Sequence, residues 1–307
     1  MSTSESELLD DLQPRAFAIA YRMLGSVSEA EDIVQEALVR IHQAIERGEE
    51  ISSPRAYVGT ITTRLAIDEL RSARARRETY VGEWLPEPMV SDPREDPASQ
   101  AEMADSLSLA FLVLLESLSP EQRAALLLHD VFDYGYAEIA EIIGKSEDNA
   151  RQLAARARRH VEERRPRFET SEEQRERLAD RFFAAAQEGD VAELEALLAH
   201  DVVARGDGGG KAPALARPLH GRSRVARTLA NWMRVAFRIP GVEFRRVDVN
   251  GEPGAVMLDG EGRVAAVMAL DIGGGEVRAV SSVVNPDKLR RLGPVADVSA
   301  LLRQLRR

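Results

Sequence analysis

The chain has 307 residues, a formal net charge of −10 at pH 7 and no cysteine. Its length allows two or three domains, and its acidic balance argues against a protein that coats nucleic acid with its whole surface. The absence of thiols excludes disulfides, thiolate metal sites and a cysteine nucleophile. No apolar run reaches the ~20 residues of a membrane helix, and the acidic, serine-rich start does not resemble a signal peptide. We therefore expect a soluble, cytoplasmic protein with no membrane partner.

Helix patterns dominate the first half of the chain. Ser28 and Glu31 form a capping-box pattern, and the apolar residues that follow predict a helix over residues 29–45. A second predicted helix covers residues 54–77, and arginines gather in its C-terminal half, where they suit the helix dipole. The capping pattern Ser119-Pro120-Glu121-Gln122 predicts the start of another helix.

The charges alternate along this half of the chain. One basic block ends the helix over 54–77, a second covers residues 151–167, and the segment 78–105 between them is acidic. This alternation predicts two nucleic-acid surfaces separated by a linker. Several prolines exclude regular helix from the linker, and we expect Trp84 within it to dock on another part of the protein.

Residues 134–159 predict two helices joined by a glycine turn. Gly144 can adopt the left-handed backbone of a tight turn, and Ser146 can cap the second helix. On this segment alone, an ordinary helical hairpin with a solvated basic face remains an alternative to a DNA-reading helix-turn-helix. The polar residues suited to phosphates and guanine edges in a major groove are Lys145, Ser146, Asn149, Arg151, Gln152, Arg156, Arg158 and Arg159.

Strand patterns dominate the second half, which begins near Pro166. Ser171 and Gln174 form a further capping pair, and helices are followed by apolar segments bounded by Gly, Asp and Asn. The predicted fold is α+β, with a curved antiparallel sheet and a cavity between the sheet and its helices. The expected strands cover residues 201–205, 242–249, 255–258, 264–272 and 277–284, and the expected helices cover residues 190–199 and 223–237.

Four segments of the first half, in this order, resemble the extracytoplasmic-function (ECF) sigma factors, which are promoter-recognition subunits of bacterial RNA polymerase. They are residues 21–25 (YRMLG), 30–40 (AEDIVQEALVR), 55–71 (RAYVGTITTRLAIDELR) and 118–123 (LSPEQR), the last followed by the helical hairpin. The resemblance implies that the first three segments belong to sigma region 2, and that the fourth segment and the helical hairpin belong to sigma region 4.

The resemblance assigns roles to residues that would otherwise be read as a solvated helix face or as core. The resemblance implies that the residues contacting the polymerase clamp are Asp32, Gln35, Glu36 and Arg40. Contact with the −10 element falls to Tyr57, Thr60, Thr63, Arg64, Arg71, Arg74, Arg76 and Arg77, and the basic hairpin would read the −35 element. Many relatives carry tryptophan where Tyr57 stands and asparagine at or beside Ala66, which leaves the base preference at −10 open.

The second half resembles the SnoaL-like domains of the NTF2-like cone fold. Three short motifs, WLPEP at 84–88, DGGGK at 207–211 and NPDKL at 285–289, resemble the sigma-J-like group, whose members carry such a domain as a fused extension. This implies a regulatory domain that replaces a separate anti-sigma protein and holds the DNA-binding regions in a compact, poorly binding arrangement. The residues expected to make these contacts are Trp84, Leu85, Pro86, Asp207, Gly208, Gly209, Gly210, Lys211, Asn285, Pro286, Asp287, Lys288 and Leu289.

The expected architecture is therefore two all-α sigma domains, a region 2 helical bundle and a region 4 helix-turn-helix, plus a C-terminal α+β NTF2-like cone. The expected domains are residues 1–77, a linker at 78–105, residues 106–166, residues 167–289, and a tail at 290–307. We expect a monomer that binds the clamp and flap of core RNA polymerase and promoter DNA, with no cofactor, no metal and room for an unidentified small ligand in the SnoaL-like domain.

Two other functions remain open: a ligand-sensing helix-turn-helix regulator, and a SnoaL-type enzyme fused to a DNA-binding region. The enzyme would need a general acid or base, for which His200, Asp201, His220 and Asp271 are available. Their spacing forms no recognisable catalytic set, and we expect both histidines at helix ends or in loops. Residues 207–211 lack the spacing of a phosphate-binding loop.

Overall fold

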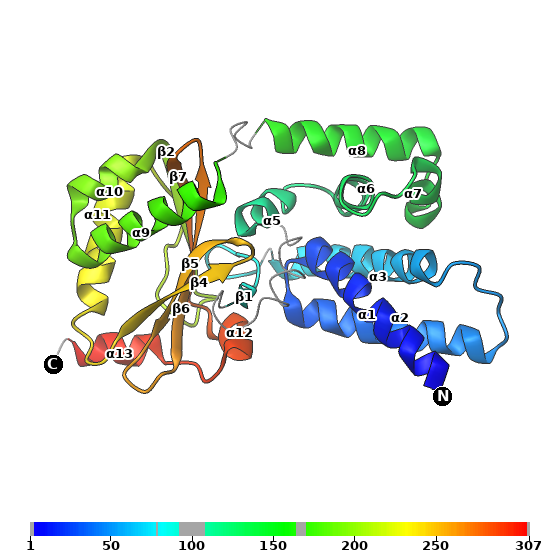
Figure 1. Ribbon diagram of the computed structural model, residues 1–307, viewed down its shortest axis with the longest axis horizontal. Coiled ribbons are helices and arrows are strands. Elements are labelled where there is room, and N and C mark those ends of the chain that lie inside the picture. Colours follow the sequence, from blue (N-terminus) through cyan, green and yellow to red (C-terminus); the bar gives the residue numbers. More distant parts are fainter. Residues whose placement is uncertain (1–2, 78, 92–107, 164–169, 306–307) are drawn as a thin grey trace. The chain divides into compact units, whose positions relative to one another are not determined.

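The computed structural model describes residues 3–77, 79–91, 108–163 and 170–305, and the side chains of residues 3–6 and 73–77 lie outside the described part (Figure 1). The chain divides into two compact units. The helical unit comprises Met1–Glu78 and Leu112–Arg165, and the sheet unit comprises Thr79–Phe111 and Pro166–Arg307. The described part of the linker thus belongs to the same unit as the C-terminal domain.

Three helices form the first part of the helical unit: α1 (Thr3–Leu24), α2 (Val27–Glu46) and α3 (Pro54–Arg77). The predicted start of α2 is wrong by two residues, because Ser26 caps the helix by accepting a hydrogen bond from the amide of Glu29 at 3.3 Å. The earlier start lets Val27 extend the apolar stripe and become buried in the core.

The second part contains α5 (Leu109–Leu115), which spans the junction of the two units, α6 (Pro120–Asp130), α7 (Tyr136–Ile143) and α8 (Glu147–Glu162). The capping box of α6 is present, because Ser119 Oγ accepts from Gln122 N at 3.2 Å and Gln122 Oε1 accepts from Ser119 N at 2.9 Å. The predicted helical hairpin is confirmed as α7 and α8, joined through Gly144 with φ of 67°.

The sheet unit is an α+β fold, as predicted (Figure 1). Its helices include α9 (Glu172–Glu188), α10 (Val191–Leu197), α11 (Arg222–Ala236), α12 (Pro286–Leu289) and α13 (Val298–Gln304). The expectation of a purely antiparallel sheet is wrong, because β2 and β7 run parallel. The strand order is β1 (Val90–Ser91), β4 (Glu243–Val249), β5 (Glu252–Leu258), β6 (Val264–Gly273), β7 (Glu276–Val283), β2 (Leu198–Asp207) and β3 (Leu219–His220).

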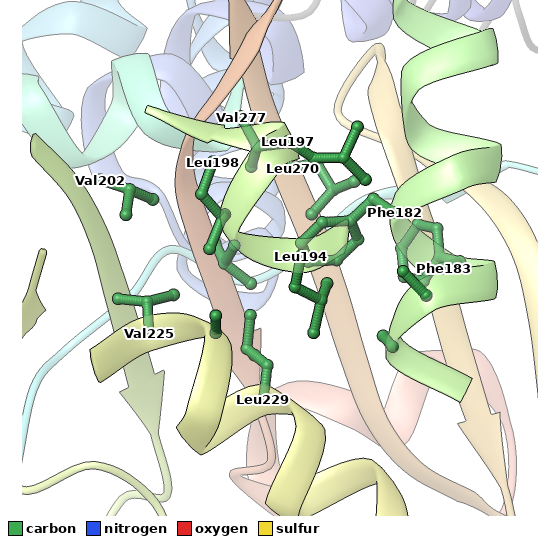
Figure 2. Close-up of a cluster of buried hydrophobic side chains, with 14 of the residues drawn as sticks. Phe182, Phe183, Leu194, Leu197, Leu198, Val202, Val225, Leu229, Leu270 and Val277 are labelled. Atoms are coloured by element: carbon green, nitrogen blue, oxygen red, sulfur yellow. The ribbon is translucent and has the colours of Figure 1, made fainter. Parts of the chain in front are cut away.

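The core of the sheet unit lies between the sheet and α9, α10 and α11. Figure 2 shows side chains from the three helices and from the strands meeting there. Phe182 and Leu194 are fully buried in this core, and Leu270 reaches it from β6. Each such side chain stabilises the fold by about 1.5–3 kcal/mol relative to an exposed position.

The linker contributes the edge strand β1, which the sequence did not predict. Val90 and Ser91 pair with Val249 and Asp248 of β4. Asn250 extends the pairing, because its side-chain Oδ1 accepts from Met89 N at 3.0 Å and its own amide donates to Met89 O at 2.9 Å. The prolines exclude helix, as expected, but the segment after them completes the sheet.

Glu252 gives this fold a pH dependence. Its carboxylate, 17% exposed, pairs with Arg175 at 3.1 Å. Burial raises the pKa of Glu252 to about 7, and Asp271 and Asp248 add to the rise while Arg175 opposes it. The pKa of Glu252 is higher in the folded state than the 4.5 expected for the unfolded chain, so the folded state binds the proton more tightly. The free energy of unfolding that this proton contributes is complete below pH 4.5 and is lost as the pH rises through 7.

We therefore expect Glu252→Gln to reduce the loss of stability between pH 5 and pH 8 by about 1–3 kcal/mol. Chemical denaturation of the full chain at both pH values measures the difference. The matched control is Glu243→Gln, at an exposed carboxylate of β4, which should leave the wild-type pH dependence in place. An unchanged pH dependence in Glu252→Gln would contradict the assignment.

Candidate functional site

Helix α8 and the turn before it carry the polar residues predicted to read the −35 element. Ala150, Ala154 and Ala157 are buried on its opposite face, which leaves the polar residues outward. Seven of the eight predicted residues are exposed: Lys145, Ser146, Asn149, Arg151, Gln152, Arg156 and Arg159. An exposed basic face opposite a buried apolar face is the arrangement that a helix needs to enter a major groove.

Arg158 differs from the other seven. It is half-buried, and its guanidinium donates two hydrogen bonds to Asp130 of α6, one of them at 3.0 Å from Nε to Oδ2. The hydrogen bonds to Asp130 raise the pKa of Arg158. This bidentate pair joins α8 to α6, so Arg158 holds the two helices together in this arrangement.

The predicted −10 residues on α3 are less accessible. Arg64 and Arg71 are exposed, Tyr57 and Thr60 are half-buried, and Thr63 is fully buried. The hydroxyl of Thr60 donates to the carbonyl of Ala56 within the helix at 2.9 Å. The side chains of Arg74, Arg76 and Arg77 lie outside the described part of the chain.

The exposed arginines of α3 bind the second part of the helical unit. Arg64 donates to two backbone carbonyls in the last turn of α7, from Nε to Ile142 O at 3.1 Å and from Nη2 to Glu141 O at 2.8 Å. Arg71 pairs with Glu121 of α6 at 2.7 Å. Partial burial would raise the pKa of Glu121, but hydrogen bonds from Arg71 and Ser119 lower it overall. A cation at the C-terminal end of α7 is also favoured by the helix dipole.

Gly59 provides a notch on α3 for Tyr134, which precedes α7. A Cβ atom at Gly59 would overlap the hydroxyl oxygen of Tyr134 and lie 3.0 Å from its Cζ. Only glycine therefore permits this approach. Tyr134 is 5% exposed, its ring centroid lies 5.4 Å from the guanidinium of Arg15, and its hydroxyl has no hydrogen-bond partner among the described residues.

Arg123 is a residue that sequence reasoning treated only as part of a motif. It is 2% exposed and joins α6 to α1 by donating from Nη1 to Met23 O at 2.6 Å. It also donates to Leu115 O at 3.1 Å and pairs with Glu116 at 2.7 Å. An arginine within the apolar sequence of α6 was the available signal.

We call the contacts of Arg64, Arg71, Arg123 and the Gly59–Tyr134 pair the closed interface.

The face of α2 predicted to bind polymerase is open to solvent in the helical unit. The residues Asp32, Gln35, Glu36 and Arg40 are all exposed, and Arg40 Nε donates to Glu36 Oε1 at 2.8 Å. Val39 lies among them with 49% exposure. An exposed apolar side chain within a charged helix face suits a protein partner.

In the sheet unit, the side chain of Asp207 binds the linker through hydrogen bonds. Its carboxylate is fully buried and accepts four hydrogen bonds. Oδ1 accepts from Tyr80 Oη at 2.6 Å and Gly209 N at 3.0 Å, and Oδ2 accepts from Leu85 N at 2.9 Å and Lys288 Nζ at 2.7 Å. A buried charge requires this degree of pairing, because each missing partner would leave it poorly solvated.

Asn285, Lys288 and Trp84 complete the cluster. Asn285 Nδ2 donates to Tyr80 Oη at 2.8 Å, and Lys288 Nζ donates to Leu85 O. The Lys288 ammonium lies 4.1 Å from the Trp84 ring centroid, within cation–π range. Burial, followed by the bond to Asp207, raises the pKa of Tyr80. We call the set Tyr80, Trp84, Leu85, Asp207, Asn285 and Lys288 the linker anchor.

The structure thus brings the three predicted regulatory motifs together. Lys211 forms an ion pair with Asp287, and Arg205 pairs with Glu83 at 3.1 Å. The remaining predicted residues, Pro86, Gly208, Gly209, Gly210, Pro286 and Leu289, lie in the same segments. Tyr80 and Glu83, which sequence reasoning missed, add two further polar contacts from the linker.

A cavity of about 280 Å³ lies in the sheet unit. The candidate acid–base residues His200, Asp201, His220 and Asp271 do not line it. Both histidines are exposed and lie on strands β2 and β3 instead of helix ends or loops. Within the described residues, no group of three or more histidine, aspartate and glutamate side chains is placed to hold a metal ion.

A basic helix-turn-helix packed with a three-helix bundle, in one chain with an α+β cone, defines a multidomain DNA-binding protein of transcription. The family model for Sigma-70 region 2 matches residues 8–76, that for Sigma-70 region 4 matches residues 108–161, and that for the SnoaL-like domain matches residues 179–284. Among the described residues, no helix has the length and apolarity needed to cross a membrane.

Two sigma factors are similar to this chain over most of its length. The chain is 38% identical to the ECF RNA polymerase sigma factor SigJ of Mycobacterium tuberculosis, over 94% of this chain and 93% of that protein. It is 32% identical to the probable sigma factor SigI of the same species, over 88% and 90%. The crystal structure of M. tuberculosis SigJ matches with a TM-score of 0.75 at 36% identity, covering 93% of this chain and 98% of that one. The chain belongs to the ECF RNA polymerase sigma factors.

We expect Asp207→Asn to release the linker, because it removes the negative charge that pairs with Lys288 and replaces one of the two carboxylate oxygens that accept the four hydrogen bonds. Hydrogen exchange at the Leu85 amide should accelerate at least about tenfold, which corresponds to ~1.4 kcal/mol. The control, Asp287→Asn, breaks the more exposed pair with Lys211 and should change exchange at Leu85 little. Unchanged exchange at Leu85 in Asp207→Asn would contradict the role of this carboxylate.

Proposed function

We propose that this sigma factor directs core RNA polymerase to specific promoters from the cytoplasm, and that its sheet unit controls its activity in cis. The observation that carries the proposal is the coexistence, in one chain, of both sigma-70 regions with an exposed polymerase-type face on α2 and an exposed basic face on α8. The clamp and flap of polymerase and the promoter DNA are its partners.

Region 2 would hold melted −10 DNA on α3. Tyr57 and Thr60 would line a pocket for an unstacked base, and Arg64 and Arg71 would hold the strand's phosphates. Arg74, Arg76 and Arg77 are further candidates for phosphate contact. Region 4 would read the −35 element through α8, with Arg158 kept in its pair with Asp130. Asp32, Gln35, Glu36 and Arg40 would contact the clamp.

The closed interface supports regulation, because it uses the same groups that DNA would need. Arg64 donates to the end of α7, and Thr63 is fully buried. The Tyr134 hydroxyl, which approaches Gly59 in the closed interface, is buried without a hydrogen-bond partner among the described residues. Such a group is rare in an interface formed only for stability, and here it favours a contact that opens so that region 2 can bind another ligand.

The linker anchor supports control from within the chain. Tyr80 lies only three positions beyond Arg77, where α3 ends, so region 2 is tethered closely to the docked segment. Docking of the linker therefore limits how far regions 2 and 4 can separate. Core polymerase would favour the open state through its greater affinity for that state.

Run-off transcription with core polymerase tests the proposal. The full chain is compared with chains ending near residue 168 and near residue 284. We expect promoter-specific transcripts that require the chain, and outputs that differ among the three lengths. Specific gel shifts without core polymerase, together with no polymerase-dependent transcript, would favour an independent helix-turn-helix regulator instead. Equal output from all three chains would contradict control in cis.

We expect Gly59→Ala to open the closed interface, because the new Cβ overlaps the Tyr134 hydroxyl. Alanine itself favours helix α3 by about 1 kcal/mol, so loss of α3 does not explain an effect. Run-off output at a limiting concentration of the protein should rise roughly 3–10-fold, corresponding to a shift of ~1 kcal/mol in the closed–open equilibrium.

The double variant Gly59→Ala/Tyr134→Phe is the matched control. It removes the overlapping oxygen, whose hydroxyl lacks a partner, and leaves Tyr134 Cζ 3.0 Å from the new Cβ as the nearest remaining atom. Output should return toward that of the wild type. Equally raised or equally lowered output from both variants would show that Gly59 acts on DNA or polymerase directly and not through the closed interface.

A further inference from the structure

We propose that the cavity of the sheet unit is an effector site for a neutral, largely apolar small molecule of two or three rings, and that its occupancy strengthens the linker anchor. The cavity of about 280 Å³ is close to the lower limit of about 300 Å³ for small-molecule sites. The regulatory role of this site rests on the proposed function, whereas the binding of an apolar ligand to the cavity does not.

The wall of the cavity determines the class of ligand. Its larger side chains include Trp232, Phe244, Met257 and Met268, and no lining residue is charged. Ser282 and Trp232 are the lining residues whose side chains carry a conventional hydrogen-bonding group. A charged ligand would therefore lose its hydration without gaining a counterion, whereas apolar rings would find aromatic and adaptable thioether surfaces.

The C-terminal tail supplies one side of this cavity. Val298 and Leu302 of α13 are part of the wall, although the match to the SnoaL-like family ends at residue 284. The segment before α13 is fixed by backbone hydrogen bonds, because Val264 N donates to Pro294 O at 2.8 Å and Ala296 N donates to Val264 O at 2.9 Å. The site is thus completed by residues outside the matched domain.

Two wall residues connect the cavity to the linker anchor. Gly206 and Val284 line the cavity, and each is followed directly by an anchor residue, Asp207 and Asn285. The backbone carbonyl of Asp207 accepts from Val284 N at 2.8 Å and from Asn285 N at 2.9 Å, which holds the ends of β2 and β7 together. A ligand that binds this ordered arrangement stabilises it, and docking of the linker with it.

The binding test uses two fluorescent probes with the same ring skeleton. N-phenyl-1-naphthylamine is neutral, and 1-anilinonaphthalene-8-sulfonate carries a sulfonate. We expect saturable binding of the neutral probe to the full chain and binding of the sulfonate at least about tenfold weaker. Absence of saturable binding by the neutral probe, or equal affinity for both probes, would overturn the proposal.

Variants locate the bound probe. Ala266→Phe and Ala236→Leu add side-chain volume at the cavity wall and should each weaken binding about tenfold. Ala192→Phe makes the same kind of change at an exposed position of α10 and should leave affinity unchanged. If Ala266→Phe fails to fold, Ala236→Leu decides the outcome. Affinity unaffected by the filling variants would place the probe elsewhere and overturn the assignment.

Hydrogen exchange at the Leu85 amide tests the coupling, because this amide donates to Asp207. Saturation with the neutral probe should slow exchange at Leu85 at least about threefold in the wild type and slow it less in Ala236→Leu at the same probe concentration, in proportion to the lower occupancy. Unchanged or faster exchange at saturation would overturn the coupling. These measurements contain no polymerase or promoter, so a failure here is distinct from a failure in run-off transcription.

Discussion

The ion pair between the fully buried Asp207 and Lys288, which is 11% exposed, is the interaction on which the arrangement of the sheet unit and linker depends. It joins the end of β2 to α12, and Asp207 accepts from Tyr80 and the Leu85 amide of the linker as well. Buried ion pairs are weak evidence for net stability, but removal of one member leaves an uncompensated charge. The pair therefore acts mainly by specifying where the linker lies, since few alternative positions would supply the same donors.

The closed interface of the helical unit has the opposite character. Both carboxylate oxygens of Asp207 accept two hydrogen bonds each, whereas the Tyr134 hydroxyl in the closed interface is buried without a partner among the described residues. Arg64 makes good hydrogen bonds there, but to backbone carbonyls at a helix end that water can also satisfy. The hydrogen bonds of the linker anchor are complete, whereas those of the closed interface are not. This difference suits a protein in which the closed interface opens more readily than the linker is released.

Local sequence patterns predicted the helices of this fold better than the contacts between residues that are far apart in the sequence. Periodicity and capping residues gave α3, α6 and the α7–α8 hairpin, because these features depend on neighbours within one helix. The start of α2 was misplaced since two serines compete as caps, and buried Val27 decides between them. Strand β1 and the roles of Tyr80 and Arg123 depend on partners far away in sequence, which no local pattern encodes. The meeting of the three linker and sheet motifs was anticipated only through family resemblance.

Cavity and anchor respond to different physical variables because of their composition. The anchor is held by hydrogen bonds and by the pairing of Lys288 with Asp207, whereas the cavity wall carries no charge and responds to apolar burial. The two are joined through Gly206–Asp207 at the end of β2 and through Val284–Asn285 directly after the adjacent strand β7. An apolar molecule can therefore change linker docking without competing for any hydrogen bond of the anchor, and its effect is limited to its difference in affinity between the docked and released states.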